Sequence, residues 1–505
     1  MPGHRRRGRQ PPGLSAADRA RHAHRDPAWQ ARGRVMSELR NAYDVAVIGA
    51  GPAGMAAATL CARAGLATVL FDEQDSPGGQ IYRAVTATPV RRDTVLGSDY
   101  WAGVELARVF LASGAHYVPG ATVWNLTRER EIGVSVAGSA HILRAERVIV
   151  ATGALERPFP IPGWTLPGVM TAGAGQILLK SSGLVPDGRT VLAGCGPLLW
   201  LIAWQYLNAG ARIDAILDTT ARASRAAAWR RLPPFLASPY LLKGLRLMLA
   251  VRRRVRVVAN VVDLRAEGRE RVQTITYRTT GGREQQLPVD NLFLHQGVVP
   301  NVNLAMTAGI EHRWDDAQLC WRPVLGADGG SAIPGIAIAG DGAGIAGAEA
   351  AQACGMLAGV AAVRALRPGA QGLAPEAAVR ARLKRALRGR AFLDAYYRPT
   401  DAFRRPARDT LVCRCEEVTA GEIVDTVALG CTGPNQMKAF LRCGMGPCQG
   451  RLCGLTVTEL IAQARGVAPQ DVGYYRLRPP VKPITLAELA ALPKNEAALR
   501  SVARS

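Results

Sequence analysis

The sequence predicts an α/β protein with two Rossmann-like three-layer domains and a small helical C-terminal domain. Two strand–glycine turn–helix–strand units, which begin at Tyr43 and Arg189, predict the first two domains. Six of the ten cysteines fall between Cys413 and Cys453 and predict the third. A chain of 505 residues, 48% of them hydrophobic, is long enough for about three such domains.

The first unit has every part of a dinucleotide site. Gly49-x-Gly51-x-x-Gly54 directly follows a short apolar strand and opens an alanine-rich helix. Gly49 allows the tight turn, Gly51 lets backbone N–H groups approach a pyrophosphate, and Gly54 lets the helix pack closely on the strand. Asp72 ends the next strand, where an acid accepts ribose hydroxyls. The unit therefore predicts dinucleotide binding.

The second unit departs from this pattern at one position. Gly194 and Gly196 fill the first two glycine places, whereas Leu199 stands in the third. A leucine there would push the helix off the strand and crowd the phosphate cradle, so NAD(P) binding is doubtful. A Rossmann fold without a dinucleotide is favoured, and a mononucleotide or a weakly held NAD stays open. The uncharged run 190–211 is long enough to cross a bilayer, but its glycine turn favours strand, turn and helix.

The net charge of +23 is high, and part of it lies in a leader rich in Pro, Gly and Arg. The leader has no apolar h-region, so it is not a secretory signal. A nucleic-acid arm and a transit peptide are alternatives to the favoured interpretation, a disordered or mis-assigned extension with Met36 as the working start. We expect a cytoplasmic protein, with peripheral contact with the inner membrane left open.

A second basic stretch, 222–256, has nine arginines and Lys243 and no acidic residue, and it includes leucines and aromatics. It could lie on a membrane surface, dock an acidic partner subunit, or form a solvated helical pair. Nucleic-acid binding is not expected, because no binding motif accompanies the charge.

The C-terminal cysteines have the spacing of a metal centre. Cys413-x-Cys415 and Cys448-x4-Cys453 supply four thiolates, the soft ligands that iron–sulfur clusters and zinc prefer. The single-residue spacer favours [2Fe–2S] over zinc, which usually takes longer knuckles. Cys443 is the rival fourth ligand, and a structural cluster without electron traffic is the alternative role.

The remaining reactive residues predict no chemistry of their own. The chain has no Cys-x-x-Cys, which argues against dithiol exchange beside a flavin. We expect Cys61, Cys195, Cys320 and Cys354 to be buried core thiols. None of the seven histidines has an evident acid partner, so we interpret them as structural. No general base or triad is visible, and no catalytic residue is assigned.

Three later segments, GGQIYR (78–83), RVIVATGA (147–154) and GIAIAGDGAG (335–344), resemble the signatures of two-dinucleotide-domain flavoprotein reductases. That resemblance implies FAD, a FAD domain split by the second nucleotide domain, and an aspartate, Asp341, that binds the flavin ribityl chain. The implied FAD-binding residues are Gly49, Gly51, Pro52, Ala53, Gly54, Asp72, Glu73, Gly79, Gln80, Thr152, Gly153, Gly340, Asp341, Glu349 and Ala350.

The cysteine segment resembles the bacterioferritin-associated ferredoxin-like (BFD-like) [2Fe–2S] domain at matching spacing. Residues 41–465 resemble the A or alpha subunits of octopine and nopaline oxidases. The resemblance is carried by three segments, GVMTAGAGQILLKSSG, VLAGCGPLLW and RCGMGPCQGRLCG. They are similar also to the B-type chain of hydrogen cyanide synthase and the D-hydroxyproline dehydrogenase alpha subunit. The resemblance implies a partner FAD subunit of the glycine/D-amino-acid-oxidase type (beta or B type) that oxidises a C–N bond, often with a small ferredoxin-like [2Fe–2S] subunit. An FMN at a subunit interface is left open.

These inferences divide the chain into segments. The predicted segments are a basic extension 1–40, a FAD domain 41–160 and 295–366, an inserted NAD(P)-like domain 161–294, a linker 367–410, a BFD-like [2Fe–2S] domain 411–466 and a tail 467–505.

Three functions are compatible with these features. The favoured one is an electron-relay subunit of an opine, amino-acid or imino-acid dehydrogenase. A self-sufficient NAD(P)H-dependent FAD/iron–sulfur reductase is the second, and Leu199 opposes it. A non-enzymatic iron-handling protein is the third, and the intact FAD signatures oppose it.

Overall fold

The computed structural model describes residues 39–91 and 95–492, and the N-terminal leader lies outside them. The chain divides into two units, 1–41 and 42–505, and everything below concerns the second unit. The predicted fold class is confirmed, because two separate sheets with parallel strands and covering helices are present.

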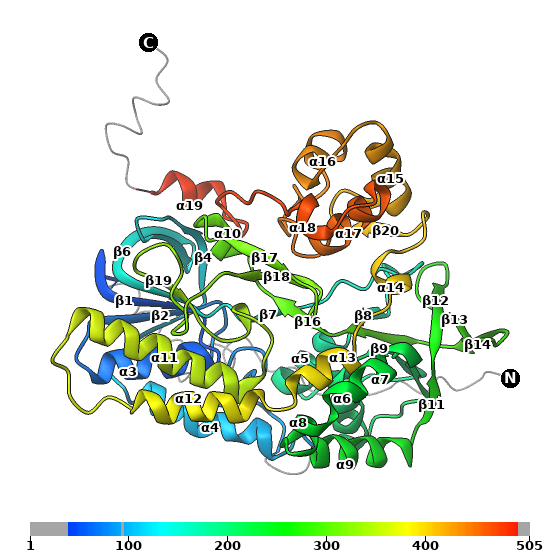
Figure 1. Cartoon of the computed structure of the whole chain (residues 1–505), viewed down its shortest axis with the longest axis horizontal. Coiled ribbons are helices and arrows are strands. Elements are labelled where there is room, and N and C mark those ends of the chain that lie inside the picture. The colour runs from blue at the N-terminus through cyan, green and yellow to red at the C-terminus, as the bar shows by residue number, and fades with distance from the viewer. Residues whose placement is uncertain (1–38, 92–94, 493–505) are drawn as a thin grey trace, which may run out of the picture. The chain divides into compact units, whose positions relative to one another are not determined.

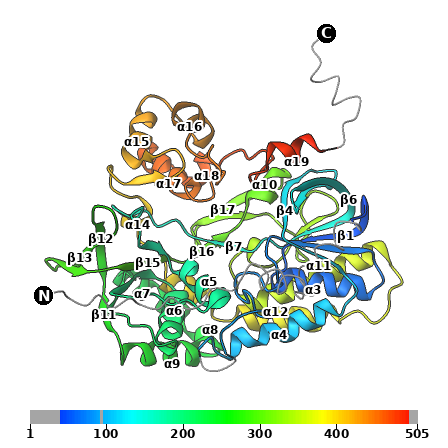
Figure 2. The same ribbon diagram turned by 180° about the vertical axis from the view of Figure 1, so that it is seen from behind.

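The first sheet has seven strands in the order β3-β2-β1-β6-β5-β4, and β19 pairs with β6. Helices α3 and α11 pack against each other on one face (Figures 1 and 2). The strand β19 and the helix α11 follow the inserted region, so the chain returns to the first sheet after leaving it. The elements are β1 (Ala42–Ile48), α3 (Pro52–Arg63), β2 (Thr68–Asp72), α4 (Ser98–Leu111), β3 (His116–Pro119), β4 (Ala121–Leu126), β5 (Glu131–Val136), β6 (Ser139–Val150), β19 (Ile336–Ile338), η2 (Gly340–Gly342) and α11 (Ala348–Leu366).

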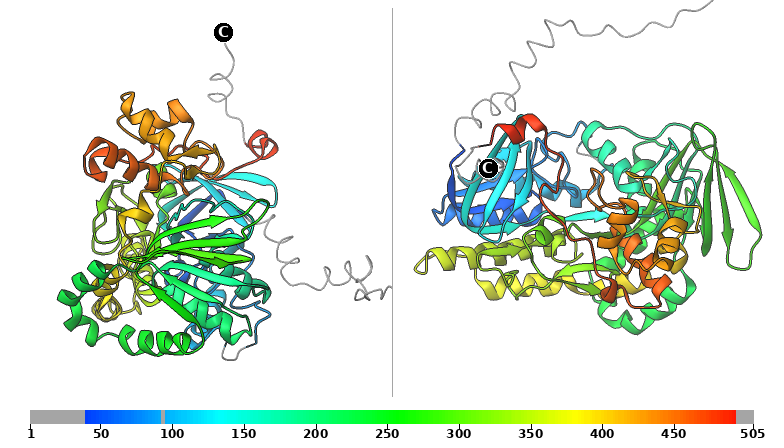
Figure 3. Two further views of the ribbon diagram at one scale, coloured as in Figure 1. Left: turned by 90° about the vertical axis from the view of Figure 1, so that its right-hand side faces the viewer. Right: turned by 90° about the horizontal axis from the view of Figure 1, so that it is seen from above.

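The second sheet has five parallel strands in the order β11-β10-β9-β15-β8. An antiparallel sheet, β12-β13-β14, projects beside it and is drawn in green in Figure 3. The uncharged run 190–211 forms strand, turn and helix as predicted. The elements are β8 (Val169–Thr171), α5 (Ala172–Ser182), β9 (Thr190–Cys195), α6 (Pro197–Asn208), β10 (Ala215–Asp218), β11 (Arg256–Ala259), β12 (Val261–Glu267), β13 (Thr274–Thr279), β14 (Glu284–Pro288) and β15 (Asn291–Gln296).

Most of the basic stretch 222–256 is helical. Its elements are α7 (Arg222–Ala228), η1 (Trp229–Arg231), α8 (Leu232–Leu236) and α9 (Tyr240–Arg252). One face of α9 packs on α6 through Leu247, Met248 and Val251. Within the described part of the chain, no helix is both long and apolar enough to cross a membrane.

Short elements join the two folds. They are β7 (Ala154–Glu156), β16 (Val298–Pro300), α10 (Asn303–Thr307), β17 (His312–Asp315) and β18 (Cys320–Pro323). Strand β16 pairs with β7, and β17 with β18. The predicted linker contains α12 (Glu376–Leu387), α13 (Arg390–Tyr396) and α14 (Asp401–Arg404), and α12 packs on α11.

The C-terminal region is mainly helical, as predicted. A capping box between Thr419 and Glu422 starts α15, which comprises the run AGEIVDTVA. The elements are β20 (Leu411–Cys413), β21 (Val418–Thr419), α15 (Ala420–Ala428), α16 (Pro434–Leu441), α17 (Gly454–Arg465), α18 (Pro469–Val472) and α19 (Leu486–Ala490).

Candidate functional site

The first glycine turn leaves room for a phosphate group. A Cβ built on Gly51 would have no neighbour closer than the Cα of Gly79, at 4.0 Å. A Cβ on Gly54 would lie 1.8 Å from the carbonyl oxygen of Gly49, so helix α3 packs on the turn as closely as glycine permits. The space beside Gly51 opens at the N-terminus of α3, where backbone N–H groups and the helix dipole favour an anion.

Asp72 ends β2 beside this turn. Its Oδ2 accepts a hydrogen bond from the Ala50 amide at 2.5 Å, and its Oδ1 accepts one from the Gln74 amide at 2.8 Å. Burial raises the pKa of the Asp72 carboxyl above its usual value, and both backbone amides act in the opposite direction. The neighbouring Glu73 is exposed and forms an ion pair with Lys482, at 2.7 Å between Nζ and Oε1.

The loop with Gly79 and Gln80 is fixed from the second fold. Lys180, on α5, is 3% exposed and donates hydrogen bonds to the carbonyl oxygens of Gln80 (3.2 Å) and Ile81 (2.9 Å). Burial lowers the pKa of the Lys180 ammonium from 10.5 to about 7, and nearby Arg83 contributes. Lys180 therefore ties the loop opposite Gly51 to the inserted region.

The other predicted FAD residues gather around η2 and the end of β6. Asp341 accepts hydrogen bonds at Oδ1 from the amides of Ala346 and Gly347, which lead into α11. Its Oδ2 has no hydrogen-bond partner in the described part of the chain, so it can bind a ligand hydroxyl. Thr152 donates to the Asn301 carbonyl oxygen at 3.3 Å, and Gly153 has a φ of 67°.

The remaining predicted positions have less direct roles. Gly340 lies close to Ala53, because an added Cβ would come within 2.8 Å of the alanine Cβ. Ala350 is buried in α11, Glu349 is exposed in its first turn, and Pro52 is half-buried at the start of α3. The open space at Gly51, the acid of Asp72 and the available Oδ2 of Asp341 together fit FAD.

The second glycine turn is filled by the protein itself. A Cβ on Gly196 would meet the imidazole ring of His295 at 3.1 Å, so the ring lies where the first turn has open space. His295 is 2% exposed, and its Nδ1 lies 2.6 Å from Oε1 of Glu156. The interpretation that no histidine has an acid partner is therefore wrong: the pair is formed across 139 positions of sequence, which no local pattern reveals.

The ribose end of the second fold is also covered. Asp218, which ends β10, accepts hydrogen bonds from the Thr220 amide and from Arg225, each at 2.9 Å. The Cys195 thiol, between the two glycines of the turn, donates to the carbonyl oxygen of Tyr397 at 3.4 Å. Helix α13, which precedes Tyr397, packs against α7 (Figure 1).

Leu199 has a different effect from the one predicted. Its side chain is fully buried in the hydrophobic core with Trp200, Ile202 and Phe293. His295, and not the leucine, is the group that the structure places against the glycine turn. Three of the isolated cysteines are buried core thiols as predicted, and burial raises the pKa of Cys61, Cys195 and Cys320 to about 12. The prediction is wrong for Cys354, which is only half-buried, although burial raises its pKa also.

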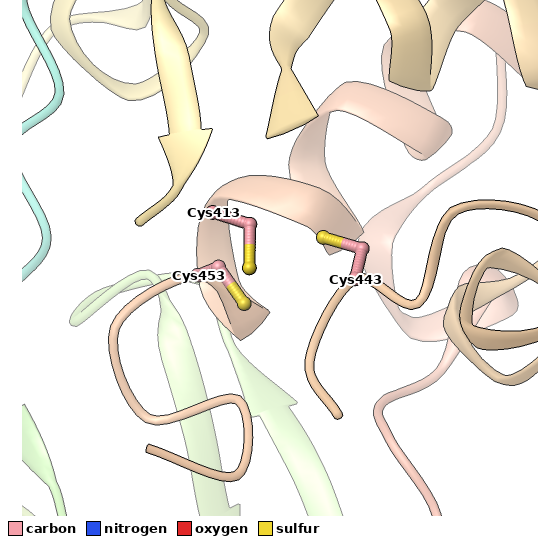
Figure 4. A group of neighbouring side chains, drawn as sticks. All are labelled: Cys413, Cys443 and Cys453. Carbon is pink, nitrogen blue, oxygen red and sulfur yellow. The ribbon is translucent and has the colours of Figure 1, made fainter. Parts of the chain in front are cut away.

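The C-terminal cysteines form one cluster. The sulfurs of Cys413, Cys443 and Cys453 lie within 4.8 Å of one another and point into a common space (Figure 4). The structure thus brings Cys443, the rival ligand, into the same group of sulfurs as Cys413 and Cys453. All three side chains are buried.

Cys415 and Cys448 continue this cluster. Hydrogen bonds from the thiols of Cys443 and Cys453 lower the pKa of Cys413 from 9.0 to about 2. A hydrogen bond from Cys453 lowers the pKa of Cys448 to about 5, and Cys448 also contacts Cys415. All four predicted ligands are therefore connected by sulfur–sulfur contacts, together with a fifth thiol.

Backbone amides face these sulfurs. The amides of Gly444 and Glu416 lie against Cys413, and those of Gly450 and Leu452 lie against Cys448. A Cβ on Gly446 would approach Sγ of Cys415 to 3.1 Å, so glycine is needed there. A group of at least four cysteine sulfurs, three of them with backbone N–H donors, fits an iron–sulfur cluster, because such donors stabilise its negative charge.

The cysteine region packs directly on the elements that join the two folds. Leu455 and Trp321 belong to one hydrophobic cluster, and Met306 and Tyr474 pack against it. Asn303 of α10 donates a hydrogen bond to the carbonyl oxygen of Gln449, one residue after Cys448, at 2.9 Å. The thiols are therefore held against α10, which begins shortly after Asn301. The carbonyl oxygen of Asn301 accepts the hydrogen bond from Thr152.

Comparison with known proteins identifies the family. Residues 43–356 match the pyridine nucleotide-disulphide oxidoreductase family, and residues 407–492 match the sarcosine oxidase A3 domain. The A subunit of opine oxidase from Rhizobium meliloti is 50% identical over 482 residues, which cover 92% of this chain and 90% of that protein. The chain belongs to the family of opine oxidase A subunits.

Other members and a solved structure agree with this assignment. The opine oxidase A subunit of Agrobacterium tumefaciens (strain Ach5) is 49% identical, over 93% of this chain and 95% of that one. Hydrogen cyanide synthase subunit HcnB of Pseudomonas aeruginosa is 33% identical, over 87% and 96%. The crystal structure of L-proline dehydrogenase from P. horikoshii has the same fold, with a TM-score of 0.64 at 19% identity over 89% of this chain and 79% of that one. The predicted resemblance is confirmed, and the chain is an oxidoreductase with an FAD-binding fold.

Proposed function

We propose that this chain is the electron-transfer subunit of a heteromeric dehydrogenase that oxidises a C–N bond of an opine, amino acid or imino acid. Substrate oxidation occurs in a partner FAD subunit of the glycine/D-amino-acid-oxidase type. The observation that carries the proposal is the group of three buried thiols, Cys413, Cys443 and Cys453, with Cys415 and Cys448 in contact with it. This group packs against an open FAD-binding fold, in a chain whose relatives are opine oxidase A subunits.

The proposed ligands of a [2Fe–2S] cluster are Cys413, Cys415, Cys448 and Cys453, with Cys443 as an additional thiol. The proposed FAD residues are those of the first glycine turn, Asp72 and Asp341. A flavin exchanges two electrons with a substrate or one at a time with a cluster, so both groups together suit a relay. The chain's own residues hold these groups, line the sulfurs with N–H donors and exclude water from Cys413 and Cys453.

The second candidate, an NAD(P)H-dependent reductase, has a specific observation against it. The place of a pyrophosphate at Gly196 holds the His295 ring, and the carboxylate of Asp218 already pairs with Arg225. Binding NAD(P)H would require the His295 ring to leave the turn and the ion pair between Asp218 and Arg225 to break. We therefore propose that the second fold is structural and that electrons enter from the partner.

The exposed face of α9 is our proposed docking surface for that partner. Leu242, Leu245 and Leu249 are each at least 50% exposed and share one helical face. The basic stretch around them has no acidic residue, so an acidic rim on the partner subunit would complement it. Leu245→Asp should abolish co-purification of the partner and keep the flavin, whereas Leu178→Asp, an exposed leucine on α5, should not. Retention of the partner with loss of binding to anionic vesicles would instead indicate a membrane contact.

The test of the function is anaerobic co-purification of the chain with its partner, followed by cofactor analysis. We expect iron and labile sulfide in equal amounts, no zinc, and dye reduction with an opine, glycine or hydroxyproline. Cys413→Ser and Cys448→Ser should remove the iron and most dye reduction through this chain. Cys431→Ser is the matched control, because that buried thiol donates only to the Gly433 carbonyl oxygen, at 3.4 Å, within the described residues. Stoichiometric zinc, or full turnover of both variants, would contradict the proposal.

A further inference from the structure

Tyr475 lies beside two thiols of the cysteine cluster, although it belongs to the predicted tail. It follows α18 and is 2% exposed. A Cβ on Gly444 would lie 2.5 Å from its ring, and one on Gly450 would lie 2.6 Å from it. The ring therefore occupies space that only glycine leaves on both sides, and its position is fixed by packing.

The hydroxyl of Tyr475 is directed at sulfur. It donates a hydrogen bond to Sγ of Cys443 at 3.5 Å and lies 3.7 Å from Sγ of Cys453. Among the residues that the structure describes, these two sulfurs are its hydrogen-bonding partners. A buried phenol usually has a hydrogen-bond partner. Here the possible partners are Cys453, a proposed cluster ligand, and Cys443, the additional thiol.

The neighbouring Tyr474 makes a different contact. Its hydroxyl donates to the carbonyl oxygen of Gly450 at 3.3 Å, and its ring packs against Trp321 with 6.3 Å between ring centroids. The two tyrosines therefore have different contacts: Tyr474 packs the cysteine region on the rest of the chain, and the hydroxyl of Tyr475 faces the thiols.

We infer that Tyr475 is a positioning residue that raises the reduction potential of the cluster by donating a hydrogen bond to the Cys453 thiolate. This inference rests on the proposed function, because it requires a cluster held by Cys453. Reduction adds negative charge to the cluster and its thiolates, so a donor to sulfur stabilises the reduced form more than the oxidised form. Cys443, outside the proposed ligand set, can donate its S–H to the tyrosine oxygen while the tyrosine O–H turns to Cys453.

The test compares Tyr475→Phe with Tyr474→Phe in the anaerobically purified complex. Both variants remove one hydroxyl and keep the ring, so packing between the glycines is retained. Iron content and the spectrum of the reduced cluster are measured first, and a redox titration then gives the midpoint potential. We expect Tyr475→Phe to keep its iron and to lower the equilibrium constant for reduction about tenfold, a shift of about 59 mV to more negative potential for one electron. Tyr474→Phe should match the wild type.

The outcomes separate this inference from the proposed function. An unchanged potential in Tyr475→Phe with its iron retained overturns the inference and leaves the proposed function standing. Loss of iron in Tyr475→Phe but not in Tyr474→Phe also overturns it, because a hydroxyl that only tunes the potential is not needed to hold the metal. A wild-type complex without iron overturns the proposed function itself.

Discussion

The two nucleotide folds of this chain share a backbone design and differ in what occupies it. The first glycines have the same role, and Gly49 and Gly194 both have positive φ. Each packs against a carbonyl oxygen near the end of the neighbouring strand in its sheet: that of Ala151 for Gly49 and that of His295 for Gly194. The difference begins at the second glycine. The space beside Gly51 is open, whereas the space beside Gly196 contains an imidazole ring. A Rossmann backbone is therefore retained in both folds, while room for a nucleotide is retained in one.

The third glycine place shows the same division. Gly54 is needed because α3 touches the Gly49 carbonyl oxygen, and Leu199 is accommodated because it belongs to the core of the second fold. In the second fold, therefore, the residue that breaks the glycine pattern, Leu199, is not the residue that fills the turn, which is His295.

The largest effect is expected from placing the second fold's residue in the first. Gly54→Leu would put a Cβ 1.8 Å from the Gly49 carbonyl oxygen and displace α3 from the turn. We expect flavin binding to be lost, as measured by flavin absorbance per chain after gel filtration. Retention of flavin at wild-type stoichiometry would show that the close helix packing is not required.

The reciprocal change tests the second fold. Leu199→Ala removes a fully buried side chain and should lower the free energy of unfolding by about 3 kcal/mol. It should not create an NAD(P)H site, because His295 still fills the turn. Anaerobic mixing with NADPH should leave the flavin oxidised in both wild type and variant, and rapid bleaching in either would contradict the comparison.

The two ribose-end acids provide a smaller contrast. Asp72→Asn weakens the hydrogen bonds that the Asp72 carboxylate accepts from the Ala50 and Gln74 amides. The dissociation constant for FAD should therefore rise about tenfold. Asp218→Asn affects a carboxylate that pairs with Arg225 and should leave FAD binding unchanged. Fluorescence of released flavin on dilution measures both, and equal effects of the two substitutions would contradict the assignment.

A pH-dependent effect is expected at Lys180, which joins the two folds. Its folded-state pKa, about 7, is lower than the 10.5 of the unfolded chain. Between these values the unfolded chain binds a proton that the folded chain lacks, so the free energy of unfolding should rise with pH, by up to about 1.4 kcal/mol per unit. Below about pH 7 this contribution is constant. Denaturant unfolding at pH 7, 8 and 9 should show a shallower rise in Lys180→Met, and identical slopes would rule out the shifted lysine.

Local features of this chain could be predicted because they depend on neighbours in sequence. The strand before Gly49, the helix after it, the acid at Asp72 and the capping box before α15 all follow from patterns within a few residues. The same holds for Cys413-x-Cys415 and Cys448-x4-Cys453, whose spacing already indicates a metal centre.

Contacts between distant segments could not be predicted in this way. No motif marks the partners in three such contacts. They are the pair of His295 with Glu156, the hydrogen bond from Cys195 to Tyr397 and the hydrogen bond from Tyr475 to Cys443. The sequence predicts a tail after residue 466, yet this segment contributes the aromatic ring beside the thiols.

The sequence by itself determined the two Rossmann-like folds, the FAD-type glycine turn and the set of clustered thiols, because turn geometry and ligand spacing are short-range properties. The tertiary structure alone decided that the second turn is filled, that Cys443 joins the thiols and that a tyrosine faces them. Those outcomes depend on which side chains from separate strands converge at one point, and burial of His295 and Tyr475 is decided only when the sheets and helices have packed.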